Sequence, residues 1–151
     1  MGREKRILVV EDDDAIRALL FTVLRRRGFK VDTAQNGAKG LERFRQCVYS
    51  LVLLDLMMPV MNGYQFLDHL QAMNLAHHPL VLVLTAGAPP RNLDPKIVAG
   101  ALRKPFDIDL LVETVVACLS TQGDAAQMGD CPTADSDGET NREVSPRDKA
   151  N

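Results

Sequence analysis

Short apolar runs alternate along this chain with longer stretches in which apolar and polar residues are mixed. The runs are rich in valine and leucine and are flanked by turn residues, a pattern typical of buried parallel strands. They are Ile7–Val10, Val31–Ala34, Leu51–Leu54, Leu80–Leu84 and the weaker Ala101–Leu102. We therefore predict five strands.

The mixed stretches between the runs predict amphipathic helices, because their apolar positions recur every three or four residues. The predicted helices are Ala15–Arg27, closed by Gly28, then Ala38–Val48, Tyr64–Leu75, and a last helix capped by Asp107. At the first of them we expect Asp14 to be the cap and Asp13 a first-turn acid favoured by the helix dipole.

The stretch before the fifth run contains several prolines, which a helix interior does not tolerate. With Asp94 as cap and Pro95 in the first helical position, it allows only a short fourth helix that ends near Gly100. Strands that alternate with helices predict an α/β fold, in which helices cover both faces of a parallel sheet.

Composition and charge divide the chain into two parts. Apolar residues make up 46% and charged residues 25%, as in soluble globular proteins, and the net charge of −2 requires neither nucleic acid nor a membrane surface as partner. Residues 120–151 contain seven acids and three bases, have no apolar period and include Pro132 and Pro146. We predict a folded domain over residues 1–120 and a disordered acidic tail over 121–151.

Nothing near the start of the chain predicts export or membrane insertion. The apolar run Ile7–Val10 is too short for a signal peptide or a membrane span. Three cysteines, Cys47, Cys118 and Cys131, have no CxxC spacing, which predicts reduced thiols. We therefore expect a cytoplasmic protein.

Polar residues gather where the predicted strands end. Glu11 and Asp12 follow the first strand, Asp55 the third, Thr85 the fourth and Lys104 the fifth. Carboxyl ends of parallel strands meet at one edge of a sheet, where such folds place their functional residues. Clustered carboxylates need a compensating cation, and Mg²⁺ suits carboxylate and phosphate oxygens. Carboxylates, a hydroxyl and an ammonium together predict a phosphoryl-transfer site with a carboxylate nucleophile.

Four sequence blocks resemble the motifs of response-regulator receiver domains, in the order found in that family. The blocks are ILVVEDD, LVLLDLMMPVMNGYQFL, VLT and RKPF, and the resemblance covers about residues 5–120. It implies a flavodoxin-like, doubly wound fold like that of the chemotaxis regulator, with five strands in the order 2-1-3-4-5.

The resemblance also implies a role for each matching residue. Asp55 corresponds to the phosphoacceptor, and Asp12 and Glu11 to the acids that hold Mg²⁺, with the backbone carbonyl of Met57 as a further ligand. Thr85 and Lys104 correspond to the hydroxyl and the amine that contact the phosphoryl group. The Lys104–Pro105 bond is expected to be cis, and Pro59 and Gly63 to shape the loop after Asp55, Gly63 through its tolerance of positive φ.

The implied function is a stand-alone response regulator. Its partner is a histidine kinase or a histidine phosphotransfer protein, and its downstream target is another protein, with no direct contact to nucleic acid. It is not expected to be an enzyme beyond its own phosphorylation and a slow dephosphorylation, because neither Met57 nor Gly87 can orient a hydrolytic water. An aspartate-nucleophile phosphatase is disfavoured, since those enzymes place the nucleophile after the first strand and a second Asp where Met57 stands here.

Two departures from the family favour an alternative, a pseudo-receiver that binds partners without phosphorylation. Ala101 stands where an aromatic residue is usual, and the segment between Thr85 and Lys104 is short. Other candidates have simpler explanations. We interpret the three methionines of the loop after Asp55 as packing residues; they are Met57, Met58 and Met61. We interpret His77-His78 as part of a polar turn. We interpret Arg25-Arg26-Arg27 as a solvated helix end.

Overall fold

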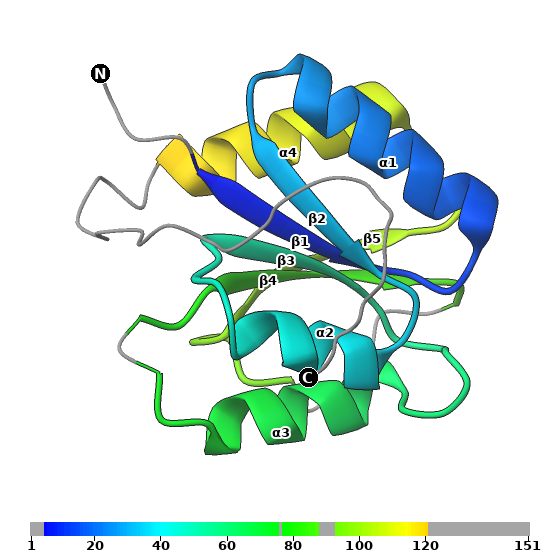
Figure 1. The fold of residues 1–151 in the computed structure, drawn as a ribbon. Coiled ribbons are helices and arrows are strands. Elements are labelled where there is room, and N and C mark those ends of the chain that lie inside the picture. Colours follow the sequence, from blue (N-terminus) through cyan, green and yellow to red (C-terminus); the bar gives the residue numbers. More distant parts are fainter. Residues whose placement is uncertain (1–4, 76, 88–92, 121–151) are drawn as a thin grey trace, which may run out of the picture.

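Five parallel strands form the centre of the molecule in a computed structural model that describes residues 5–75, 77–87 and 93–120 (Figure 1). They are β1 (Arg6–Val10), β2 (Lys30–Ala34), β3 (Leu51–Asp55), β4 (Leu80–Thr85) and β5 (Val98–Arg103). The sheet order is β2-β1-β3-β4-β5, and every neighbouring pair is parallel. The expected sheet and its order are confirmed.

Helices cover both faces of this sheet. They are α1 (Asp14–Arg26), α2 (Gly37–Phe44), α3 (Gly63–Ala72) and α4 (Ile108–Ser120). Figure 1 shows α1 and α4 on one face and α2 and α3 on the other, each pair packed on its own apolar cluster. No helix among the described residues is long and apolar enough to cross a membrane.

The central strands read as continuous apolar runs because both of their faces are buried. Along β1, Ile7 and Val9 pack in the cluster beneath α1 and α4, whereas Leu8 and Val10 pack in the cluster beneath α2 and α3. Every residue of β3 is buried. Such strands are held from both sides, which gives the residues that follow them rigid attachment points.

The start of α1 differs from the prediction. Asp13, not Asp14, is the cap: its backbone is extended and its Oδ1 accepts a hydrogen bond from the Ile16 N–H at 3.0 Å. Asp14 lies in the first turn instead. The predicted end is confirmed, since Gly28 has a φ of +95° and its N–H bonds the Arg25 carbonyl.

Two other helices are shorter than the sequence predicts. The second ends at Phe44 rather than Val48, because the chain turns there and buries Tyr49. The Tyr49 ring packs edge-on against Phe44, and its hydroxyl donates to Asp32 at 2.6 Å. The third ends at Ala72, three residues early, because Met73 has an extended backbone.

The short fourth helix predicted between Asp94 and Gly100 is wrong. Residues 95–97 form a turn, in which the Asp94 side chain accepts a bond from the Lys96 N–H and its carbonyl accepts bonds from Ile97 and Val98. Residues 98–100 already belong to β5, whose pairing with β4 leaves no room for a helical turn. Residues 88–92 lie outside the described part of the chain.

The cysteine prediction holds only in part. Cys118 is a reduced, partly buried thiol, and burial raises its pKa. Cys47 is disulfide-bonded, contrary to the expectation of reduced thiols. Cys131 and the predicted tail, residues 121–151, lie outside the described residues.

Candidate functional site

Three acids from two neighbouring strands meet at the carboxyl edge of the sheet. Glu11 and Asp12 follow β1, and Asp55 is the last residue of β3. One carboxylate oxygen of each lies within 4.8 Å of the others. Glu11 is fully buried and Asp55 is 3% exposed, whereas Asp12 opens to solvent. The fold thus brings together the acids that the sequence predicts to share a site.

Lys104 joins this cluster from the end of β5. Its Nζ lies 3.0 Å from Glu11 Oε1 and 3.5 Å from Asp55 Oδ1, and it donates a hydrogen bond of 3.3 Å to Glu11 Oε2. The Lys104–Pro105 peptide is cis, as expected. One ammonium therefore bridges the two buried carboxylates.

Burial and neighbouring charge act together on Asp55. Desolvation, and then the negative charge of Glu11, raise the pKa of Asp55 to about 7, against smaller opposing effects of the Met57 N–H and Lys104. At neutral pH a substantial part of the Asp55 carboxyl is therefore protonated. A cation bound beside it would favour the ionised form, which is the nucleophilic one.

The pKa of Lys104 reflects the opposite balance. Burial alone would lower the pKa of this ammonium, but its hydrogen bond and ion pairs with Glu11 and Asp55 outweigh burial and raise it. Lys104 is therefore charged at neutral pH, and it supplies the positive charge that the two buried acids require.

Thr85 and Met57 occupy the same edge of the sheet. Asp55 pairs with Leu84 across the β3–β4 ladder, so Thr85 extends one residue beyond it. Thr85 is buried, its Oγ1 accepts a bond from the Gly87 N–H at 3.3 Å, and its carbonyl accepts one from the Lys104 N–H at 2.7 Å. The Met57 N–H donates to Asp55 Oδ1 at 3.2 Å. The role of the Met57 carbonyl as a metal ligand stays a prediction.

The loop after β3 depends on Gly63, but not for the reason the sequence suggested. No positive φ is found at Gly63; a Cβ there would lie 2.7 Å from the Leu56 Cα and 2.8 Å from the Asp55 carbonyl oxygen. Positive φ falls instead on Val60, at +71°, where a β-branched residue is strained. Gly63 is thus needed because α3 begins directly against the strand that carries Asp55.

The donor set suits a hard divalent cation such as Mg²⁺. It consists of carboxylate oxygens, which Mg²⁺ prefers. Glu11 Oε1 is buried and accepts no hydrogen bond within the described residues, although the Lys104 ammonium lies 3.0 Å away. A buried carboxylate oxygen with unused acceptor capacity, beside two further carboxylates, fits a cation better than it fits a closed structural ion pair.

Sequence reasoning missed Arg17, which touches the backbone of the acidic segment. Its Nη1 donates to the Glu11 carbonyl oxygen at 2.9 Å, and its Nη2 pairs with the Asp14 carboxylate. The available signal was the spacing from Asp14 to Arg17, since residues three apart on a helix are neighbours. That spacing reveals the ion pair but not the contact with the carbonyl.

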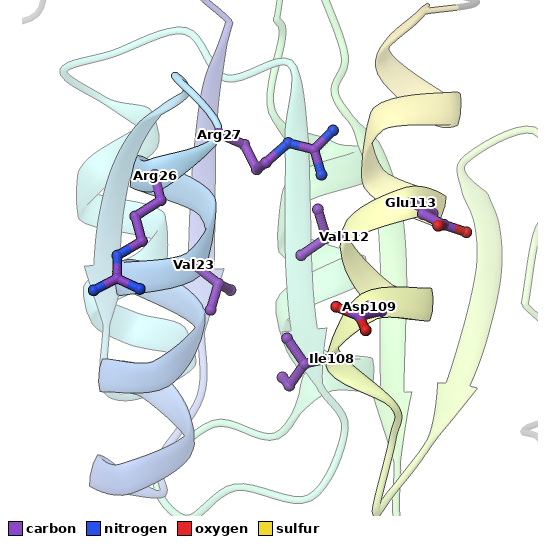
Figure 2. Close-up of a pocket in the computed structure, with 7 residues that line it drawn as sticks. All are labelled: Val23, Arg26, Arg27, Ile108, Asp109, Val112 and Glu113. Carbon is purple, nitrogen blue, oxygen red and sulfur yellow. The ribbon is translucent and has the colours of Figure 1, made fainter.

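A groove of about 270 Å³ lies apart from this cluster, between α1 and α4 (Figure 2). Figure 2 shows Val23, Arg26 and Arg27 on the α1 side and Ile108, Asp109, Val112 and Glu113 on the α4 side. It shares no residue with the acidic cluster. Arg25, Arg26 and Arg27 are exposed, which agrees with their interpretation as a solvated helix end.

Comparison with known proteins gives one consistent family. The sequence profile of the response regulator receiver domain matches residues 7–116. The regulatory protein VanRB of Enterococcus faecalis is 34% identical over 125 residues, which are 81% of this chain and 56% of that protein. The CpxR homolog of Haemophilus influenzae is 36% identical over 117 residues, 76% of this chain and 50% of that protein. This chain therefore spans about half the length of these relatives.

Solved structures agree with this result. The CheY-like receiver domain protein of Methanospirillum hungatei superposes with a TM-score of 0.71 at 26% identity, over 79% of this chain and 97% of that one. The response regulator TrrA of Thermotoga maritima, solved in complex with Mg²⁺-BeF, gives a TM-score of 0.66 at 34% identity, over 76% of this chain and 98% of that one.

Proposed function

This chain belongs to the response regulator receiver domain family, and we propose that it is a switch that takes a phosphoryl group on Asp55. The donor is a histidine kinase or a histidine phosphotransfer protein, and the output is a changed interaction with another protein. One observation carries the proposal: the buried Asp55 carboxylate lies beside two other acids and within 3.5 Å of the Lys104 ammonium.

The proposed reaction moves one phosphoryl group. A carboxylate oxygen of Asp55 attacks the phosphorus of a phosphohistidine, an acyl phosphate forms, and the phosphorus–nitrogen bond breaks with its electron pair kept by the imidazole. Small-molecule acyl phosphates can serve as donors in the same way. The protein's part is to position the nucleophile and to neutralise charge on the phosphoryl oxygens.

Each site residue has a defined task in this proposal. Glu11, Asp12, Asp55 and the Met57 carbonyl would hold Mg²⁺, which when bound neutralises charge on carboxylate and phosphate oxygens. Lys104 leaves its ion pair with Asp55 to contact a phosphoryl oxygen. The Thr85 hydroxyl, whose oxygen accepts a weak hydrogen bond from the Gly87 N–H, donates a hydrogen bond to another phosphoryl oxygen.

Acetyl phosphate tests the proposal directly. With Mg²⁺ present, intact mass spectrometry of the wild-type protein is expected to show the addition of one phosphoryl group. Asp55→Asn abolishes the addition, because an amide is not a nucleophile. Asp68→Asn, an exposed aspartate on α3, serves as the matched control and is modified like the wild type.

No addition to the folded wild-type protein would favour the pseudo-receiver. A specific observation keeps that alternative open: Ala101, which replaces the usual aromatic, is exposed on β5, and a turn stands where a fourth helix was predicted. The same partner would then bind equally well with and without acetyl phosphate.

Three wider properties are part of the same proposal. We propose a cytoplasmic regulator without enzymatic activity toward other substrates. The named relatives are longer than this chain, and one is called a transcriptional regulatory protein, so direct nucleic-acid contact is proposed to be absent only for residues 1–120. The functional edge of that domain carries the acidic cluster of Glu11, Asp12 and Asp55.

The acyl phosphate is proposed to be long-lived. The Met57 side chain is 69% exposed at the rim of the site and has no polar atom that could orient a water, and Gly87 has no side chain. Met57→Asn supplies an amide there and is expected to speed the loss of phosphate several-fold, followed by mass spectrometry after removal of the donor. Equal rates in Met57→Asn and the wild type would contradict this explanation.

A further inference from the structure

We propose that Arg17 is a positioning residue for the acidic segment, an inference that rests on the function proposed above. Glu11, Asp12, Asp13 and Asp14 are four consecutive acids between β1 and α1. Their charges repel one another and repel Asp55, which opposes the compact turn that brings Glu11 and Asp12 close to Asp55. A cation that fixes this backbone without occupying the metal-binding carboxylates would solve the problem.

The Arg17 guanidinium has this geometry. Its Nη1 donates to the Glu11 carbonyl oxygen at 2.9 Å and lies 3.5 Å from the Asp12 carbonyl oxygen, while its Nη2 pairs with the Asp14 carboxylate. The Arg17 guanidinium thus contacts three of the four acidic residues. It uses backbone carbonyls at Glu11 and Asp12, so Arg17 itself occupies neither of their carboxylates.

The remaining contacts of the segment place the effect of Arg17 at the backbone of Asp12. Glu11 is held by the Lys104 ammonium and by the Asp13 N–H, which donates to Glu11 Oε2 at 3.1 Å. Asp13 is held by its capping bond to Ile16. Asp12 is exposed. Its carboxyl interacts with that of Asp55, and the contact of its carbonyl oxygen with Arg17, at 3.5 Å, orients the peptide that carries this carboxyl.

The Arg17 side chain is 19% exposed, so its bonds form in a partly desolvated setting where a charged donor contributes more than it does in water. The planar guanidinium presents its N–H donors in fixed directions, so it sets the orientation of the groups that it binds as well as their distance. A lysine ammonium does not set this orientation. The consequence falls on cation binding, because the direction of the Asp12 carboxylate decides whether it can share a cation with Glu11 and Asp55.

A role of Arg17 through its charge and a role through positioning predict opposite changes in Mg²⁺ affinity when Arg17 is removed. If Arg17 acted only through its charge, its loss would leave the site more negative and Mg²⁺ would bind more tightly. If Arg17 positions the segment, its loss disorders Asp12 and Mg²⁺ binds more weakly. A purely structural role would lower the melting temperature and leave the affinity of the folded protein for Mg²⁺ unchanged.

Calorimetric titration of the full chain with MgCl₂ alone, without phosphate donor, tests the inference. Arg17→Ala is expected to raise the Kd for Mg²⁺ about tenfold, the scale typical for residues that orient metal ligands. Arg17→Lys keeps the positive charge but lacks the two-pronged guanidinium, so its Kd is expected to lie between those of the wild type and Arg17→Ala. Arg26→Ala removes the same charge from the exposed end of the same helix and leaves the Kd unchanged.

The outcomes separate this inference from the proposed function. Wild-type protein that does not bind Mg²⁺ overturns both. Wild-type protein that binds Mg²⁺, together with Arg17 variants of equal or tighter affinity, overturns the role of Arg17 alone. Should Arg17→Ala fail to fold, the charge-retaining Arg17→Lys decides: weaker binding supports positioning, and unchanged binding contradicts it.

Discussion

Asp55 is the residue at which burial and charge conflict most directly. It ends a fully buried strand, beside a fully buried glutamate, and these surroundings raise its pKa to about 7. A carboxyl group in the unfolded chain has a pKa of about 3.9. The folded, metal-free protein therefore binds a proton at Asp55 over a pH range in which the unfolded chain does not.

This difference makes the stability of the metal-free protein depend on pH. The contribution of Asp55 is fully present below about pH 4 and is lost as the pH rises through about 7. Asp55→Asn does not titrate, so its free energy of unfolding, relative to that of the wild type, should be about 1–3 kcal/mol larger at pH 8 than at pH 5. Urea unfolding in EDTA measures this.

The control for that experiment is Asp68→Asn, which changes an exposed aspartate on α3. Its free energy of unfolding relative to the wild type should be nearly the same at pH 5 and pH 8. If the stability of Asp55→Asn relative to the wild type does not grow with pH, burial does not raise the pKa of Asp55 in the metal-free fold.

Lys104 and a divalent cation compete for the same carboxylates. The ammonium lies 3.0 Å from Glu11 and 3.5 Å from Asp55. Lys104→Met is therefore expected to tighten Mg²⁺ binding several-fold and, at the same time, to slow phosphorylation by acetyl phosphate, because a cationic partner of the phosphoryl group is lost.

Calorimetry and the time course of mass change measure the two effects of Lys104→Met. Lys39→Met, at an exposed lysine on α2, should change neither. Weaker Mg²⁺ binding in Lys104→Met would mean that the lysine orders the acids rather than competing for them.

At the scale of elements, the loop between β3 and α3 is set by close packing. Asn62 and Gln65 form a capping box that starts α3, and Gly63 lies against the backbone of Leu56 and Asp55. The helix can begin this close to the strand only because residue 63 has no side chain. The position of Asp55 therefore depends on a contact that belongs to neither element alone.

Gly63→Ala tests this dependence. The added Cβ would lie 2.7 Å from the Leu56 Cα, which cannot move without the strand, so we expect a loss of about 2–3 kcal/mol in the free energy of unfolding. Gly100→Ala on β5 is the control, because its Cβ would meet Leu82 at an ordinary 3.5 Å. Chemical denaturation compares the two, and equal stabilities would contradict the packing argument.

At the scale of the whole molecule, two apolar clusters and one sheet are enough to account for the domain. Within the described part of the chain, the buried residues of both clusters lie between Ile7 and Leu119. A chain that ends after Ser120 is therefore expected, under reducing conditions, to melt within a few degrees of the full chain and to accept phosphate at the same rate. A large loss of melting temperature would place part of the fold beyond residue 120.

Local patterns in the sequence were sufficient for the five strands, for four of the five predicted helices and for the candidate residues. Strand runs buried on both faces are apolar throughout, amphipathic helices repeat every three or four residues, and strand-end acids mark the site. Each of these signals is contained in a short window. For this reason the sheet, its order and the cluster of Glu11, Asp12, Asp55 and Lys104 could be proposed before any coordinates, the order with help from the family resemblance.

Only the tertiary structure decided features that depend on contacts between distant segments or on the path of a turn. These include the pairing of Lys104 with Glu11, 93 residues apart, the choice of Asp13 over Asp14 as cap, and the packing role of Gly63. They also include the turn that replaces the predicted fourth helix. Their physical reason is shared: neighbouring conformations of similar local energy are selected by packing and by long-range charge, which no short window of sequence contains.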